Sequence, residues 1–254
     1  MLDMQILPLL HTSISYLKQP GKRKWINLAR SLKGLTGLEI GGPSTFFHNG
    51  KHLPVYLFAN RVDVANYSSE TVWEGTIQEG LNYNYFNNKK GYQYISEATD
   101  LNKVKDNTYD FVLSCHSLEH VANPIKALLE WKRVLKPNGK LILILPYKAS
   151  TFDSKRPFTT FQHLLNDYHN NIGETDTTHF EEIVALHDTS KHPEFVSQAV
   201  FEQLLADNYK NRCAHHHVFN MEVVKEMLNY AGFSVTEQEI IHNFHLTTFA
   251  QRNN

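Results

Sequence analysis

The strand–helix–strand segment of residues 109–146 constrains the fold most. Tyr109–Cys115 and Leu141–Pro146 are short, almost uninterrupted apolar stretches, as expected of buried strands. Between them, Asn123 and Pro124 supply a helix cap and a first-turn residue, and apolar residues follow at helical spacing. We expect Asn138-Gly139 to close this helix. Strands that are apolar on both faces indicate a parallel sheet covered by helices on both sides. We therefore predict an α/β fold.

A glycine turn follows the first predicted strand. The segment of residues 35–46 is LTGLEIGGPSTF, in which an apolar stretch carrying Glu39 leads into Gly41, Gly42 and Pro43. Glycines at the carboxyl end of a strand let a nucleotide-like ligand approach the backbone. An ordinary corner between a strand and a loop has the same pattern, so this segment alone leaves both interpretations open.

The next segments predict further strands of the same sheet. Residues 53–58 are apolar and predict a second strand, residues 92–95 predict a third, and residues 68–88 predict a loop with one short helix. Asp63 lies about two dozen residues after Glu39, where a carboxylate commonly accepts hydrogen bonds from both ribose hydroxyls. A solvated turn aspartate is the alternative interpretation.

Both ends of the chain complete this picture. Residues 1–34 predict two short helices separated by Pro20 and Gly21. Near the other end, Asn220 caps a predicted helix that Gly232 closes, and two strands joined at residues 242–243 form a hairpin.

Composition excludes several classes of partner. The 254 residues carry 25 Lys and Arg against 26 Asp and Glu, a formal net charge of -1, which argues against binding nucleic acid or anionic membranes. No segment approaches the roughly 20 apolar residues of a membrane span. The first ten residues lack the basic region of a signal peptide. Only two cysteines, Cys115 and Cys213, are present, so we expect a reducing, cytoplasmic location.

Three segments together resemble a known family. GLEIGGPS at 37–44, EATDL at 97–101 and YDFVLSCHSLEHVANPIKALLEWKRVLKPNGKLILILP at 109–146 are similar to class I S-adenosylmethionine-dependent methyltransferases, particularly the type 11 methyltransferase-domain group. The resemblance implies a Rossmann-like sheet that is mostly parallel, with an antiparallel strand near the C-terminus. It also implies S-adenosylmethionine as the methyl donor and S-adenosylhomocysteine as the product.

The resemblance further implies a set of cofactor-binding residues at the ends of the strands: Glu39, Gly41, Gly42, Pro43, Asp63, Asp100, Leu101, Ser114 and His116. In the family, the glycine turn passes under the methionine part of the cofactor, and Asp63 would hold the ribose. Asp100 would accept a hydrogen bond from the adenine amine. The turn here is Gly-Gly-Pro-Ser, which departs from the usual G-x-G pattern.

A competing interpretation concerns HSLEH at residues 116–120. His116, Glu119 and His120 match H-x-x-E-H, a zinc-peptidase pattern that requires one helix carrying both histidines. A predicted strand leads directly into His116 and a new helix starts at Asn123, so we disfavour this interpretation. We place His120 at the mouth of the cofactor pocket; the alternative is a loop histidine without a role.

Residues 151–218 leave the predicted sheet after its fifth strand and predict helices joined by polar loops. We expect an N-terminal helical segment (1–34), a cofactor-binding core (35–150 and 219–254) and an inserted helical cap (151–218). The resemblance implies that such a cap lies over the methyl group and binds the acceptor. The cap is rich in histidine: His163, His169, His179, His187, His192, His215, His216 and His217.

These histidines allow two kinds of chemistry. One is a general base that takes the acceptor's proton, for which we name His120, His163 and His216. The other is a divalent metal site that combines histidine with Asp188 or Glu182, and the sequence leaves its existence open. Histidines at the surface of a cap without any chemical role are the ordinary alternative.

The function that we predict is direct in-line methyl transfer to an oxygen or nitrogen of a small molecule or sugar. No basic stripe suggests a nucleic-acid acceptor. Arg156 and Lys155 could hold an anionic group of the substrate, or they could be solvated surface charges. Two alternatives remain: an enzyme of this fold that uses the sulfonium for a reaction other than methylation, and a cofactor-binding module without catalysis.

Overall fold

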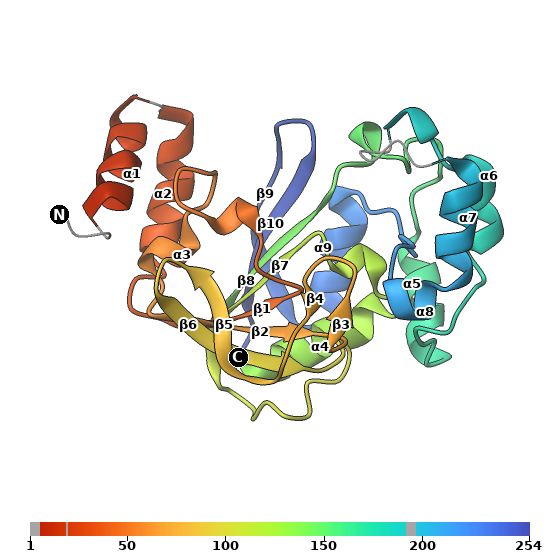
Figure 1. The fold of residues 1–254 in the computed structure, drawn as a ribbon, viewed down its shortest axis with the longest axis horizontal. Coiled ribbons are helices and arrows are strands. Elements are labelled where there is room, and N and C mark those ends of the chain that lie inside the picture. The colour runs from red at the N-terminus through yellow and green to blue at the C-terminus, as the bar shows by residue number, and fades with distance from the viewer. Residues whose placement is uncertain (1–5, 19, 192–196) are drawn as a thin grey trace.

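An eight-stranded sheet forms the centre of the molecule, in the order β5-β6-β2-β1-β7-β8-β10-β9 (Figure 1). The structure is a computed structural model and describes residues 6–18, 20–191 and 197–254. The strands are β1 (Thr36–Ile40), β2 (Arg61–Asn66), β5 (Gly80–Phe86), β6 (Lys89–Ile95), β7 (Tyr109–Cys115), β8 (Leu135–Pro146), β9 (Phe233–Ile241) and β10 (His245–Arg252).

The pairing of the strands confirms the predicted Rossmann-like topology. Strands β6, β2, β1, β7 and β8 are parallel to one another, whereas β5 pairs antiparallel with β6, and β10 pairs antiparallel with both β8 and β9. Helix α4 (Pro124–Val134) joins β7 to β8, and the Asn123 side chain caps it by accepting from the Lys126 N–H. Residues 151–218 follow the fifth parallel strand, as expected.

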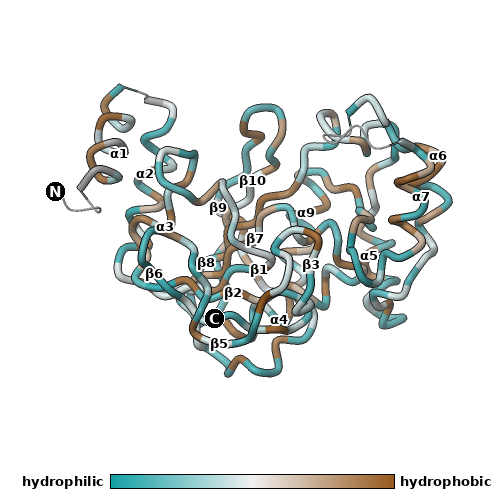
Figure 2. Tube along the Cα trace, viewed as in Figure 1, coloured by the Kyte–Doolittle hydropathy of each residue, from teal (hydrophilic) through white to brown (hydrophobic). Residues whose placement is uncertain are grey.

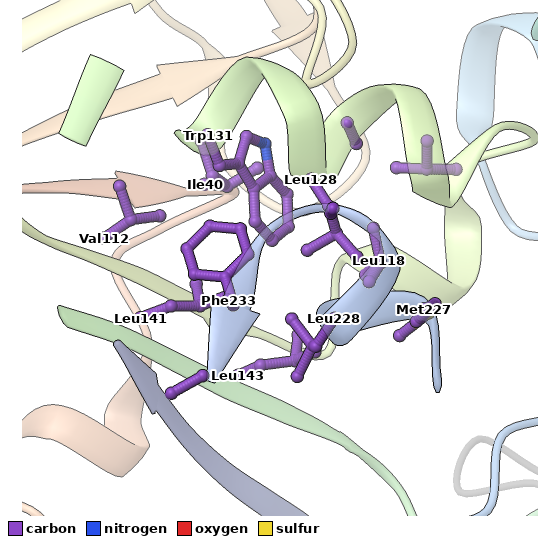
Figure 3. Close-up of a cluster of buried hydrophobic side chains, with 14 of the residues drawn as sticks. Ile40, Val112, Leu118, Leu128, Trp131, Leu141, Leu143, Met227, Leu228 and Phe233 are labelled. Atoms are coloured by element: carbon purple, nitrogen blue, oxygen red, sulfur yellow. The ribbon is translucent and has the colours of Figure 1, made fainter. Parts of the chain in front are cut away.

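Helices cover both faces of the sheet. On one face, α4 and α9 (Met221–Tyr230) pack on a core that contains Trp131, Leu141 and Phe233 (Figure 3). On the other face, α2 (Arg23–Arg30) and α3 (Val55–Phe58) pack on a second core that includes Phe111 and Ile142. Successive residues of β8 point to opposite faces, which explains why the strand is apolar throughout.

Two sequence-based expectations about the first half of the chain are wrong. Residues 53–58 contain the short helix α3 and form no second strand, because Val55 and Tyr56 are buried against the sheet from one face. An apolar stretch of six residues is too short for its periodicity to distinguish a strand from a helix. The region expected to be a loop holds β3 (Glu70–Thr71), β4 (Gly75–Thr76) and β5, of which β5 adds an antiparallel edge strand to β6.

The end of α4 also differs from the prediction. The helix ends at Val134, and β8 starts at the next residue instead of after Gly139. Asn138 adopts a positive φ of 61° inside a local shift of the β7–β8 register, so the Asn-Gly pair bends the strand and does not close the helix.

Two helices, α1 (Ile6–Lys18) and α2, occupy the N-terminal region as predicted. Helix α1 exposes an apolar face that includes Leu10 and Leu17 (Figure 2). The insertion contains α5 (Phe161–His169), α6 (Phe180–Leu186), α7 (Gln198–Ala206) and α8 (Asn208–Asn211), grouped to one side of the sheet (Figure 1). His192 lies outside the described residues. Within the described residues, no helix has the length and apolar character needed to cross a membrane.

Candidate active site

A cavity of about 660 Å³ opens at the carboxyl ends of the parallel strands. Its wall includes residues 40–41 after β1, 65–67 at the end of β2, 96–98 after β6 and 115–117 at the end of β7. The chain passes from β1 outward to β2 and β6, then crosses to β7 on the other side of β1. Open α/β sheets bind ligands at such a reversal of strand order. The volume suits an organic ligand of cofactor size.

The glycine turn forms one side of this cavity. Gly41 has a φ of +71° and lines the cavity, and a Cβ there would lie 2.6 Å from the Ser117 hydroxyl oxygen. Gly42 lies behind it, where a Cβ would lie 2.3 Å from the carboxyl carbon of Glu39. Pro43 lines the cavity beside Gly41. Glycine is therefore required at both positions by the space around the turn.

Glu39 supports the turn from inside and does not line the cavity. Its buried carboxylate accepts hydrogen bonds from the hydroxyls of Tyr56 (2.6 Å) and Tyr83 (2.7 Å) and from the Ser44 N–H (3.1 Å). Burial raises the pKa of Glu39, although these three donors oppose the effect. The prediction that Glu39 lines the cofactor site is corrected, because its oxygens face the protein interior.

Asp63 is likewise an internal residue. The Tyr92 N–H (2.7 Å), the Tyr109 hydroxyl (2.8 Å) and the Arg61 guanidinium (2.9 Å) all donate to its fully buried carboxylate. The prediction that Asp63 lines a ribose site is wrong, because β2 continues for three more residues. The strand ends at Asn66, which does line the cavity.

Three other predicted cofactor residues also lie outside the cavity wall. Leu101 and Ser114 are fully buried, and Asp100 is exposed beyond the wall. The wall is formed instead by the residues immediately after the strands. Sequence reasoning missed several of its members: Asn66, Tyr67, Trp73, Glu97, Ser117, Arg212 and Phe244. Three of these cavity-lining residues, Asn66, Glu97 and Ser117, lie at or just after the ends of apolar strands. A rule that selects the first residues after each apolar stretch would have identified them from the sequence.

His116 and His120 line the cavity as predicted. His116 has a φ of +53°, uncommon for a non-glycine residue, and its Nε2 lies 2.8 Å from Nδ1 of His245. His120 Nδ1 lies 3.1 Å from the Ala214 carbonyl oxygen. Burial and the neighbouring His215 lower the pKa of His120 to about 4, so its imidazole is neutral near pH 7. The helical part of residues 116–120 is a short 3-10 turn, Leu118–His120, which does not include His116. The single helix that a zinc-peptidase motif needs is therefore excluded.

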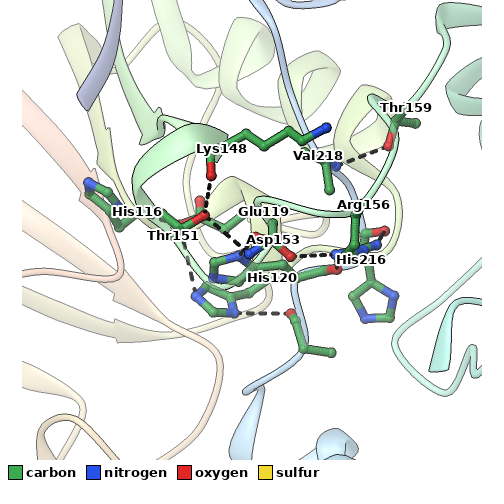
Figure 4. A network of polar contacts seen from close by, with 12 residues as sticks. His116, Glu119, His120, Lys148, Thr151, Asp153, Arg156, Thr159, His216 and Val218 are labelled. Atoms are coloured by element: carbon green, nitrogen blue, oxygen red, sulfur yellow. Dashed lines mark hydrogen bonds and ion pairs between the residues drawn. The ribbon is translucent and has the colours of Figure 1, made fainter. Parts of the chain in front are cut away.

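A polar network lies behind His120 (Figure 4). Nδ1 of His215 lies 2.5 Å from a carboxylate oxygen of Asp153. Burial alone would lower the pKa of His215, but the carboxylate of Asp153 outweighs burial, so the pKa is raised. Arg156 is 2% exposed and donates to Asp153 and to the carbonyl oxygens of His215 and His216. Arg156 is therefore neither the substrate anchor nor the solvated charge that the sequence suggested.

His163 and His216, both predicted as bases, do not line the cavity. His163 on α5 lies with its Nε2 3.1 Å from Nε2 of His179. His216 is buried with its Nε2 3.4 Å from the Asn208 side-chain nitrogen, and burial together with His179 lowers its pKa to about 3. Among the described residues of 151–218, Arg212 alone lines the cavity, paired at 2.6 Å with Glu97.

The two carboxylates that the sequence suggested as metal ligands, Glu182 and Asp188, make hydrogen bonds to other side chains. Glu182 accepts a hydrogen bond from Arg156 at 2.9 Å. Asp188 accepts from the hydroxyls of Ser154 and Ser190, each at 2.7 Å. Neither carboxylate joins the histidines in a set of potential metal ligands within the described residues.

Comparison with known protein families indicates which class of enzyme the chain resembles. Residues 61–143 match the type 11 family model, which is described as a methyltransferase domain. Over these residues, the chain resembles the class I S-adenosylmethionine-dependent methyltransferases. The matched residues run from β2 to β8 and include three of the four strand ends that form the cavity.

Individual relatives match smaller parts of the chain. A segment of 46 residues (18% of this chain) is 54% identical to an uncharacterised protein of Methanocaldococcus jannaschii, and 71 residues (26%) are 35% identical to a sterol 4-C-methyltransferase of Caenorhabditis elegans. The matches span only 20% and 21% of the length of those relatives. An S-adenosylmethionine-dependent methyltransferase structure from Mesorhizobium loti superposes with a TM-score of 0.51 at 12% identity, covering 92% of this chain and 96% of that one, which supports the fold.

The resemblance implies S-adenosylmethionine as the cofactor, and the cavity fits it. Gly41 lines the cavity, and a Cβ there would press on the Ser117 side chain, which lines the same cavity. When bound, the cofactor supplies an electrophilic methyl group on a sulfonium.

Proposed function

We propose that the chain is a methyltransferase that acts on an oxygen or nitrogen of a small molecule or a sugar. The observation that carries the proposal is that the glycine turn, His116 and His120 all line one cavity. A donor held by the turn and an acceptor held near the histidines would share the same enclosed space.

The cofactor contacts that we propose follow the strand ends. Gly41 and Ser117 would hold the methionine part, Asn66 the ribose hydroxyls, and residues 96–98 the adenine. Each of these lines the cavity and belongs to a different strand end. Asn66 offers both an acceptor and donors, which suits a pair of hydroxyls.

The acceptor side of the cavity combines aromatic and polar groups. Phe46, Trp73 and Phe244 line it together with His120 and Arg212. Apolar faces with a few polar groups are typical of sites for small organic molecules. We propose that residues 151–218 help to bind the acceptor through Arg212. The free cysteines and the near-zero net charge also fit a cytoplasmic enzyme that does not bind nucleic acid.

The residues of the cavity would contribute mainly by alignment. Positioning an acceptor in line with a reactive carbon can supply about 7–11 kcal/mol of the barrier. The aromatic groups would exclude water, and the polar groups would orient the acceptor's lone pair.

The test is to incubate the protein with S-adenosylmethionine and separate panels of sugars, phenols and amines, and to follow products by mass spectrometry. S-adenosylhomocysteine together with one acceptor that gains a methyl group would support the proposal. Release of methylthioadenosine, or methylation of carbon only, would contradict it.

A further inference from the structure

Three side chains at the inner wall of the cavity gather as potential metal ligands. Glu119, His120 and His215 each offer one donor atom, and these atoms lie within 4.8 Å of one another. We call these residues the cavity triad. His120 lines the cavity, and the other two lie directly behind it, as Figure 4 shows for Glu119 and His120.

The other ring nitrogens of the triad are already occupied. His215 uses Nδ1 to contact Asp153 at 2.5 Å, and His120 uses Nδ1 to contact the Ala214 carbonyl oxygen at 3.1 Å. Histidines that bind metals are oriented in this way, by a carboxylate or a carbonyl on the second nitrogen. Nε2 of each ring is thereby left for a common ligand.

Glu119 provides the independent observation. It is 1% exposed, and neither of its carboxylate oxygens accepts a hydrogen bond from the described residues. The nearest ring nitrogens belong to His116 at 3.6 Å and His120 at 4.0 Å. A buried carboxylate without donors costs free energy unless a cation compensates it.

We propose that the cavity triad binds a divalent transition-metal ion whose open coordination positions face the acceptor. Two imidazoles and one carboxylate form the three-ligand set of catalytic metal sites, which leave a position for water or substrate. The inference rests on the proposed function, because it gives the metal the role of binding an acceptor hydroxyl.

The chemistry balances without a further reactant. The bound acceptor O–H loses its proton to the hydrogen-bonded pair His116–His245, and its oxygen forms a bond to the methyl carbon. The carbon–sulfur bond breaks at the same time, and the electron pair stays on sulfur. Metal binding lowers the pKa of a coordinated O–H group, and His120, as a ligand of the metal, would not act as the base.

A second cluster carries its own, independent inference. His163 and Asp167 on α5, His179 before α6 and His217 before α9 each offer one donor atom within 4.8 Å of the others. We call these residues the insertion tetrad. Nε2 of His163 lies 3.1 Å from Nε2 of His179 and 3.3 Å from Oδ2 of Asp167, which lies 3.7 Å from Nε2 of His217.

The separations of 3.1 Å and 3.3 Å among His163, His179 and Asp167 match a zinc site. Ligands about 2.0–2.1 Å from a tetrahedral zinc ion are separated from one another by roughly 3.3–3.4 Å. Oδ2 of Asp167 is buried and accepts no hydrogen bond from the described residues. His217 is 1% exposed, and its Nε2 lies 3.2 Å from the Ala122 carbonyl oxygen while its Nδ1 lacks a hydrogen-bond partner among those residues. We infer that the tetrad binds a structural Zn²⁺ that fastens α5 and α6 to the chain entering α9.

Metal content tests both sites. We expect two Zn²⁺ per chain by plasma mass spectrometry after dialysis against zinc, one in Glu119→Gln, one in Asp167→Asn and none in the double variant. His169→Ala, which changes an exposed histidine of α5, should keep two. A variant that retains both ions would overturn the assignment of its site. Zinc titration of the unmodified protein against a colorimetric chelator gives the same count, and a count of zero would overturn both sites.

Two further readouts separate the roles. Glu119→Gln should bind S-adenosylhomocysteine like the unmodified protein but lose at least 100-fold in methyl transfer, whereas Asp167→Asn should lower the melting temperature and reduce its response to chelator. Unchanged transfer by chelated, folded protein would contradict the cavity metal. Two bound ions without any methyl transfer to oxygen or nitrogen acceptors would instead count against the proposed function.

Discussion

Asp63 shows how the role of a single carboxylate depends on where its strand ends. It receives three donors in the interior, so we expect Asp63→Asn to lower the free energy of unfolding by about 1–3 kcal/mol, the range for disrupting a buried charged hydrogen bond. Urea unfolding measures this. The affinity for S-adenosylhomocysteine should stay within twofold of normal, and a large selective loss of affinity would restore Asp63 to the ribose site.

Asn66 should show the opposite pattern. Replacing it with alanine removes a hydrogen-bonding side chain from the cavity wall, which we expect to weaken S-adenosylhomocysteine binding by about 1 kcal/mol, or roughly fivefold. Calorimetric titration measures the affinity, with Asp63→Asn as the matched control. If Asn66→Ala binds as tightly as the unmodified protein, the ribose lies elsewhere.

Arg156 is the clearest test of the buried polar network. Arg156→Met removes the cation that donates to Asp153 and to two carbonyl groups and leaves Asp153 with His215 alone, so we expect a loss of about 3–5 kcal/mol in unfolding free energy. Lys155→Met, next to it but 58% exposed in its side chain, should change stability little. Equal effects in urea unfolding would show that the network contributes nothing.

The sequence could identify residue types at the site but not their partners. His116 and His120 were found from HSLEH, because they directly follow an apolar strand. The contact of His215 with Asp153 joins positions 62 residues apart, and no spacing rule predicts it. The same limit explains why His163 and His216 were assigned to the wrong surroundings.

At the scale of elements, the cap of α4 also ties the insertion to the core. Asn123 accepts from the Lys126 N–H and donates to the carbonyl oxygens of Asp167 and Ile172. We expect Asn123→Ala to cost about 2–3 kcal/mol, made up of a cap and two further hydrogen bonds. Asn220→Ala, which removes the cap of α9, should cost only about 1 kcal/mol. Equal losses in thermal unfolding would contradict the tie.

Elements with strong local signals were predictable, and those defined by pairing were not. The unit β7-α4-β8 combines apolar strands with an Asn-Pro helix start, so local chemistry and tertiary packing agree. Strand β5 carries alternating Tyr and Asn residues at 82–85, a strand signal that sequence reasoning missed, but its pairing with β6 at the edge of the sheet has no signature within residues 80–86. Helix α3 is too short for its period to show.

At the scale of the molecule, the cavity lies where the order of the strands reverses, and segments from distant parts of the chain line it. Loops after β1, β2, β6 and β7 form the floor, while Trp73, Arg212 and Phe244 reach it from distant parts of the sequence. The fold and the position of the site followed from the order of strands. The identity of the distant wall residues required the structure.

The central claim is that the glycine turn and the strand ends form the cofactor site. Calorimetric titration with S-adenosylhomocysteine should show one site of micromolar affinity in the unmodified protein. Gly41→Ala, whose Cβ would press on Ser117, should bind at least tenfold more weakly. Gly34→Ala, at a similar φ of +78° but in open space, should keep full affinity despite losing about 1–2 kcal/mol of stability. Absence of binding by the folded unmodified protein, or equal affinity in Gly41→Ala, would contradict the claim.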